Sequence, residues 1–225
     1  MRRAGAEAVA HPFLITHPLD ADEDAIRDRL TSGTYTHVAL TSARTVETLR
    51  ARGLIDAIRE AGCTVVSVGP ATTGAATDAG LDVTHTGERD AESLATDLGP
   101  GANHHIWLPC SALAAPTLAD RLQAAGWEVT REELYRVEPV PSVDVDLASA
   151  WQRGIIDAVL VTSGSVARAI AGLLGHAGPG TAVVTIGEPS ARAVRTGGGI
   201  VAEVAQSPTP EGLLAACVRA LGTQK

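Results

Sequence analysis

Small hydroxyl residues stand at the ends of four short apolar runs in this chain. Ser42, Thr72, Ser163 and Ser190 each follow such a run and precede or open a segment with helical patterning. A Ser or Thr in that place can cap a helix, and the first N–H groups of a helix attract negatively charged groups. Such caps also occur on many helices that bind nothing. Because the four loops come in matched pairs, we expect them to line a site for a polyanionic ligand.

Two further side chains could take part in chemistry at such a site. Tyr135 is one of only two tyrosines in the chain, and a phenol can donate a proton to a departing hydroxyl group. The alternative is a packing tyrosine with a solvated hydroxyl. Arg44 comes two residues after Ser42. It could assist anion binding, or it could be a solvated arginine at the start of a helix.

The other reactive residue types give weaker signals. Cys63, Cys110 and Cys217 are widely spaced, which argues against a disulfide framework or a structural zinc site. Cys110 could be a nucleophile or a buried, unreactive thiol. The chain has no G-x-S-x-G elbow, no H-E-x-x-H pair and no Walker loop. The sequence therefore contains no motif that predicts a metal site or a nucleotide-binding loop.

Composition excludes several classes of partner. The formal net charge is −8 and only 3% of the 225 residues are aromatic. A chain of this kind lacks the basic surface and the stacking rings of a nucleic-acid-binding protein. No apolar run approaches membrane-spanning length, and no secretory core follows Arg2 and Arg3. We expect a cytoplasmic protein that binds neither nucleic acid nor membrane.

The elements that must position these residues alternate between strand and helix. Short runs rich in Val and Ile predict strands, and longer Ala/Leu/Arg segments predict helices. The predicted strands are 38–40, 65–68, 82–84, 105–108, 158–161, 182–186 and 201–204. The predicted helices are 45–52, 71–79, 91–98, 116–125, 166–174, 189–195 and 211–221. This alternation indicates an α/β protein with parallel sheets flanked by helices.

The same pattern occurs twice along the chain. Three landmarks recur in the same order, each as a first and a second copy: 37–44 with 157–164, 65–72 with 183–190, and 88–94 with 208–214. Reused supersecondary units produce such repeats. The repeats predict two similar lobes, and ligand sites usually lie in clefts between lobes.

Two extended segments interrupt the alternation. Residues 10–18 and 132–141 are bracketed or closed by prolines, which favour extended structure and end helices. If these segments pair, they form a two-stranded hinge. Residues 19–133 then make one continuous lobe, and residues 1–18 together with 139–225 make a second, discontinuous lobe.

Six stretches of the sequence, in this order and spacing, resemble the uroporphyrinogen-III synthase family. They are VALTSARTV (38–46), VGPATTGAATDAG (68–80), PTLADRLQAAGWEVTREELYRVEP (116–139), VLVTSGSVARA (159–169), IGEPSARA (186–193) and QSPTPEGLL (206–214). Each motif alone is weak, but together they span nearly all of the chain from about residue 10.

The resemblance carries expectations about function. It implies two α/β lobes joined by a two-stranded ladder, and a hydro-lyase that cyclises hydroxymethylbilane to uroporphyrinogen III without a cofactor. It places Ser42, Thr72, Ser163 and Ser190 at the substrate and Tyr135 at the position of the proposed acid. An enzyme made of two closed lobes needs no partner subunit, so a monomer is expected.

One departure from the family pattern affects these expectations. Family members open with a strand and a full helix that ends in a segment like residues 5–12, and this chain starts at that ending. The discontinuous lobe is therefore expected to lack its first strand and most of its first helix. The alternative function is a non-catalytic binding or regulatory homologue that kept the two-lobed scaffold.

Overall fold

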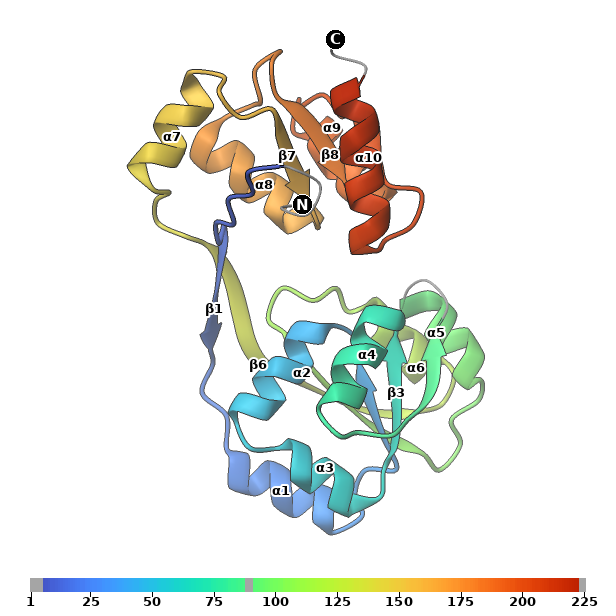
Figure 1. The fold of residues 1–225 in the computed structure, drawn as a ribbon. Helices are drawn as coiled ribbons and strands as arrows, with labels where there is room; N and C mark the ends of the chain where they lie inside the picture. Colours follow the sequence, from blue (N-terminus) through green and yellow to red (C-terminus); the bar gives the residue numbers. More distant parts are fainter. Residues whose placement is uncertain (1–5, 88–90, 223–225) are drawn as a thin grey trace. The chain divides into compact units, whose positions relative to one another are not determined.

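The computed structural model describes residues 6–87 and 91–222, which form two compact units (Figure 1). Residues 16–137 make up unit 2, and the described residues before Thr16 and after Val137 make up unit 1. Part of the third predicted repeat, residues 88–90, lies outside the described residues. The predicted division into lobes 19–133 and 1–18 with 139–225 stays a proposal.

Unit 2 is built around a six-stranded sheet in the order β1-β6-β5-β2-β3-β4. The strands of this sheet are β1 (Leu14–Pro18), β2 (His37–Leu40), β3 (Thr64–Val68), β4 (Val83–Gly87), β5 (His105–Ser111) and β6 (Glu128–Pro139). The first two residues of β1 and the last two of β6 belong to unit 1. The helices of unit 2 are α1 (Glu23–Thr31), α2 (Ala43–Ala51), α3 (Ile55–Ala61), α4 (Pro70–Asp78), α5 (Ala91–Leu98) and α6 (Thr117–Ala124). The strands β2 to β6 pair in parallel, as the alternation predicts.

Helices cover both faces of this sheet because successive strand residues point to opposite sides. Val38 and Leu40 of β2 pack in a buried cluster with residues of α1, α2, α3 and α4. Ala39, between them, packs in a second cluster with residues of α5 and α6. This arrangement explains why β2 reads as a continuous apolar run rather than an alternating one.

Unit 1 contains a three-stranded sheet in the order β7-β8-β9, also parallel. Its elements are α7 (Val145–Gln152), β7 (Ala158–Val161), α8 (Gly164–Leu174), β8 (Ala182–Thr185), α9 (Glu188–Thr196), β9 (Glu203–Val204) and α10 (Pro210–Gly222). One face packs on α10 through Ala182, Val184 and Leu213. The other packs on α7 and α8 through Trp151 and Ile170. The fold class is thus confirmed as α/β, with helices flanking two sheets in which β2 to β6 and β7 to β9 pair in parallel.

The two predicted hinge segments contain neighbouring strands, β1 and β6, which lie side by side in Figure 1. The N–H of Leu19 bonds to the carbonyl of Leu134, and the N–H of Val140 bonds to that of Phe13. Residue numbers rise on one strand as they fall on the other, so the pair is antiparallel. Strand β6 starts at Glu128, earlier than the predicted segment, because its first half is also a parallel partner of β5.

Candidate functional site

The carboxyl ends of the parallel strands in unit 2 gather most of the predicted site residues. The chain moves outward from β2 to β3 and β4 on one side, and from β5 to β6 on the other, while β2 and β5 pair with each other. Helix α2, after β2, packs on one face and α6, after β5, on the opposite face. Such a switch point leaves a crevice beyond the strand ends, where α/β proteins bind their ligands.

Ser42 begins α2 at the end of β2. Its backbone is extended, and its Oγ accepts a hydrogen bond from the N–H of Thr45 at 3.1 Å. This is the capping geometry that the Thr-Ser pattern predicts. The matched residue of unit 1, Ser163, caps α8 in the same way, with its Oγ 3.1 Å from the N–H of Val166. The first sequence repeat, residues 37–44 with 157–164, therefore has the same helix-capping structure in both copies.

Tyr135 reaches the N-terminus of α2 from β6. Its Oη lies 3.0 Å from Ser42 Oγ and 3.0 Å from Thr45 Oγ1, and these two hydroxyls are 2.9 Å apart. Tyr135 is 3% exposed and Thr45 is fully buried, whereas Ser42 is half-buried. The structure thus brings two predicted site residues together and adds Thr45, which no sequence motif singles out.

A β-bulge directs Tyr135 to that position. Cys110 of β5 pairs with Glu133 and Ser111 with Tyr135, so Leu134 is an extra residue on β6. Leu134 and Tyr135 consequently both enter the cluster under α2, although neighbouring strand residues normally face opposite ways. The carbonyl of Leu134 accepts hydrogen bonds from the N–H of Leu19 and from Nη2 of Arg52, at 3.0 and 2.9 Å. These bonds hold the bulge.

The other predicted site residues, Arg44, Thr72 and Ser190, do not join the hydroxyl cluster of Ser42, Thr45 and Tyr135. Arg44 Nη1 donates to Thr16 Oγ1 on β1 at 3.0 Å. Thr72 and Ser190 lie in the first turns of α4 and α9, and each is only 4% exposed. Helices α4 and α9 each begin after a glycine, Gly69 or Gly187, with proline in the first turn. Contact of these residues with a ligand stays a prediction.

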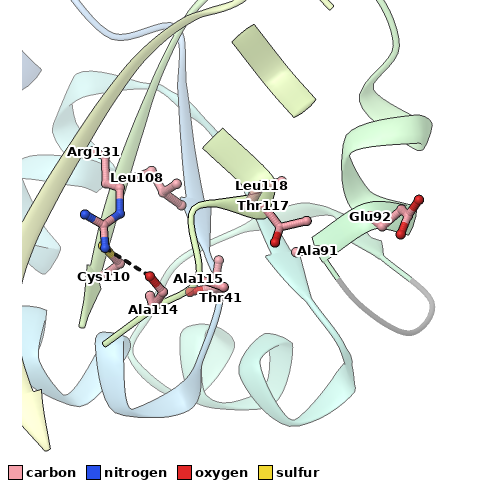
Figure 2. Close-up of a pocket in the computed structure, with 10 residues that line it drawn as sticks. All are labelled: Thr41, Ala91, Glu92, Leu108, Cys110, Ala114, Ala115, Thr117, Leu118 and Arg131. Atoms are coloured by element: carbon pink, nitrogen blue, oxygen red, sulfur yellow. Dashed lines mark hydrogen bonds between the residues drawn. The ribbon is translucent and has the colours of Figure 1, made fainter. Parts of the chain in front are cut away.

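A pocket of about 350 Å³ opens beside the switch point, on the α5 and α6 face of the sheet. Figure 2 shows its lining, with Arg131 and Glu92 far apart and apolar side chains and Thr117 between them. Arg131 Nη2 donates to the carbonyl of Ala114 at 3.1 Å, and its Nη1 lies 2.6 Å from Glu133. Thr41, next to Ser42, also lines this pocket. The pocket thus combines an apolar wall with one cationic side chain, Arg131, and one anionic side chain, Glu92.

Cys110 lines the same pocket but is unsuited to act as a nucleophile. It is buried, and burial raises the pKa of its thiol, with Arg131 opposing that effect. A thiol must lose its proton to react as a nucleophile. The geometry therefore favours the unreactive alternative.

No metal site is apparent within the described part of the chain, where no three His, Cys, Asp or Glu side chains gather as ligands would. Within the same residues, none of the helices has the length and apolar character needed to cross a membrane.

A second, smaller pocket of about 150 Å³ lies in unit 1 among α7, α8 and α9, lined mainly by apolar residues such as Trp151 and Val183.

Comparisons with known proteins agree on one family. The family model for uroporphyrinogen-III synthase HemD matches residues 1–215. A mutant uroporphyrinogen III synthase from Thermus thermophilus is 20% identical, with 94% of this chain and 88% of that one covered and a TM-score of 0.62. The uroporphyrinogen-III synthetase of Helicobacter pylori is 14% identical, with 92% and 90% covered and a TM-score of 0.65. At these identities the structures establish similarity of fold alone.

Proposed function

Because the chain belongs to the uroporphyrinogen-III synthase family, we propose that it catalyses the reaction of that family. It would cyclise hydroxymethylbilane to uroporphyrinogen III, with inversion of the last pyrrole ring and loss of water. The observation that carries this proposal is the family match over residues 1–215, joined to a tyrosine hydroxyl held at the carboxyl edge of the unit 2 sheet. No cofactor is needed, since the pyrrole nitrogens of the substrate can expel the hydroxyl group themselves.

The protein's task in this reaction is mainly one of position and proton supply. Spontaneous closure of hydroxymethylbilane gives the uninverted ring, so the catalyst must hold the chain for attack by the substituted carbon. Fixing two reacting groups in such a geometry contributes several kcal/mol to a rate. Tyr135 would supply the proton that converts the departing hydroxyl into water, as general acids do.

The acidic chain would bind the eight substrate carboxylates through local positive sites. The first N–H groups of a helix lack partners inside that helix and attract anions whatever the net charge. In unit 2, α2 offers such groups beside Ser42, with Arg44 in the same turn. In unit 1, α8 offers them beside Ser163. At the start of α9 the Ser190 N–H already bonds to the carbonyl of Gly187, so Ser190 would contribute its hydroxyl. We further propose that the pocket beside Arg131 takes one carboxylate-bearing arm, whose methylene groups fit the apolar wall.

A direct assay tests this function. Hydroxymethylbilane is generated in situ from porphobilinogen by a deaminase, the protein is added, and the products are oxidised and separated as porphyrin isomers. The expected result is type III porphyrin well above a heat-inactivated control. Formation of type I porphyrin alone would exclude the proposed enzymatic function, and binding of hydroxymethylbilane without turnover would support the non-catalytic homologue instead.

Sedimentation at several protein concentrations would test whether the protein is a monomer.

A further inference from the structure

The order of burial in the hydroxyl cluster at the start of α2 suggests which atom meets a ligand. Tyr135 is 3% exposed and Thr45 is fully buried, and both lie behind Ser42, which is half-buried. The Oη of Tyr135 and the Oγ1 of Thr45 are each within 3.0 Å of Ser42 Oγ. A substrate at the carboxyl edge of the sheet would therefore reach Ser42 before it reached the phenol.

The hydrogen bonds within the cluster allow Tyr135 to donate its proton to Ser42. Three hydroxyls carry three protons, and their three separations of 2.9 to 3.0 Å allow one hydrogen bond along each side of the triangle. Each hydroxyl can donate once and accept twice. Ser42 Oγ already accepts the N–H of Thr45. If Ser42 turns its proton outward, its remaining acceptor site is free to receive the proton of Tyr135.

We propose that Ser42 hands the proton to the departing hydroxyl group, that Tyr135 resupplies Ser42, and that Thr45 is a positioning residue that holds the phenol in line. This inference rests on the proposed function. The carbon–oxygen bond of the hydroxymethyl group breaks and its oxygen leaves as water with the Ser42 proton. Tyr135 passes its own proton to Ser42 and becomes a phenolate.

The substrate itself supplies the proton that restores Tyr135. The last pyrrole ring loses a carbon-bound proton when it regains aromaticity, and that proton returns through Ser42 to the phenolate. Between these two events the phenolate accepts hydrogen bonds from both Ser42 and Thr45. Hydrogen bonds to a charged oxygen are stronger than those to a neutral one. The Thr45 hydroxyl therefore stabilises the charged state more than the resting state, which speeds the proton transfer.

The relay makes a specific kinetic prediction for single and double variants. Ser42→Ala and Tyr135→Phe should each lower kcat by about a hundredfold to ten-thousandfold, the range for loss of a general acid, with little change in KM. The double variant should be no slower than either single variant, because both break one chain of proton transfer. Retention of most activity by Ser42→Ala, or multiplication of the two effects, would overturn the relay.

Thr45→Val removes one hydroxyl while preserving side-chain shape and the N–H that Ser42 caps. We expect kcat to fall by about tenfold to a hundredfold, the range for a lost hydrogen bond to a charged group, with KM unchanged. Thr45→Ser, which restores the hydroxyl, should recover most of that loss. An equal loss in Thr45→Ser would show that packing matters and not the hydroxyl.

The chain offers a matched control. Thr73, in the first turn of α4, forms a similar trio with Ser67 and Thr86, at 2.7 and 2.8 Å, but with no tyrosine. Thr73→Val should leave kcat unchanged. Asp22→Ala, which removes the N-cap of α1, controls for the loss of helix capping in Ser42→Ala. A loss of kcat in either control as large as in Thr45→Val would contradict the proposal.

A spectroscopic measurement tests the proton relay independently of the proposed reaction. The chain has two tyrosines, so the Raman doublet of Tyr135 is obtained as wild type minus Tyr135→Phe. The doublet depends on hydrogen bonding at the phenol, and it should change in Ser42→Ala and Thr45→Val but not in Thr73→Val. Unchanged spectra overturn the relay alone. A wild type that forms no type III isomer overturns the proposed reaction, whatever the spectra show.

Discussion

At the residue scale, Arg131 and the pocket beside it carry a prediction about substrate affinity. Arg131→Gln keeps two N–H donors but removes the positive charge that would face a carboxylate arm. We expect KM for hydroxymethylbilane to rise about tenfold, the loss of one charge-assisted hydrogen bond, with kcat nearly unchanged. Initial rates of type III formation across substrate concentrations measure this.

Glu133 provides the control for Arg131. Its carboxylate pairs with the Arg131 guanidinium at 2.6 Å, so Glu133→Gln leaves the arginine in place without its anionic partner. KM should then stay the same or fall. A rise in KM for Glu133→Gln equal to that for Arg131→Gln would show that the ion pair shapes the pocket and that the charge does not bind substrate.

Also at the residue scale, His37 predicts a dependence of stability on pH. It lies at the amino end of β2, with its ring 4.8 Å from that of Trp127 and 5.2 Å from that of His104. Burial lowers the pKa of His37 from its ordinary value of 6.5, and the neighbouring charge of His104 lowers it further. Below pH 6.5 the unfolded chain therefore takes up a proton that the folded chain resists.

The stability that His37 contributes is complete above pH 6.5 and is lost as pH falls toward its folded pKa. The glutamine variant, His37→Gln, should have a shallower fall in the free energy of unfolding over that range. His104→Gln should also reduce the slope, because it removes the second cause. Urea titrations at a series of pH values measure both, and parallel curves for wild type and His37→Gln would contradict this account.

At the element scale, Arg52 fixes the strand that carries the site tyrosine. Its guanidinium donates to the carbonyls of Leu19 and Leu134 and pairs with Glu23. The methionine variant, Arg52→Met, leaves these partners without their donor, at a cost of about 1 to 3 kcal/mol. Because Leu134 is the extra residue of the bulge, turnover should fall as well. Urea denaturation and the isomer assay give the two readouts.

Arg59 is the matched control for Arg52. It pairs with Asp56 on the exposed side of α3, and exposed pairs of this kind contribute at most about 0.5 kcal/mol. Arg59→Met should therefore change neither stability nor turnover measurably. If both methionine variants lose the same stability, the loss reflects the change of side chain and not the hydrogen bonds to the β6 bulge.

How much the sequence predicts also depends on the element. Strands β2, β3, β5, β7 and β8 were predictable because each is a dense apolar run that packs against buried clusters on both faces of its sheet. Helices α1, α3 and α7 were missed. Of these, α3 has seven residues and α7 buries only Trp151, so their apolar periodicity is too short to detect. The start of β6 was misplaced because its first residues, Glu128 to Glu133, are mostly polar.

The site residues also divide into those that local sequence predicts and those that it does not. The caps at Ser42 and Ser163 follow from local sequence, since a cap depends on residues three apart. The contact between Tyr135 and Thr45 does not, because the two residues are far apart in sequence and meet only through a bulge. Local patterns carry no signal for one extra residue in a strand.

At the scale of the whole molecule, the two units should differ in stability. Buried residues of one unit 1 cluster are largely alanines, namely Ala182, Ala205, Ala216 and Ala220. Alanine buries little apolar surface, and the free energy gained scales with that surface. Unit 2 instead buries Trp107 with many Leu and Ile side chains. We expect unit 1 to unfold at the lower concentration of denaturant.

Tryptophan positions allow this to be measured. Trp151 lies in unit 1, and Trp107 and Trp127 lie in unit 2. In Trp151→Phe, fluorescence should follow only the later transition, while circular dichroism should show both. Coincident curves from the two methods would instead indicate a single cooperative transition.

The insertion of unit 2 between the two parts of unit 1 has a consequence for synthesis. A ribosome delivers residues 16–137 as one uninterrupted stretch, so unit 2 can fold while α7 to α10 are still untranslated. The residues before Thr16 belong with a partner that emerges last. The described residues before Thr16 therefore cannot make their contacts with α7 to α10 until those helices have been translated, and chaperone dependence should concentrate in that interval.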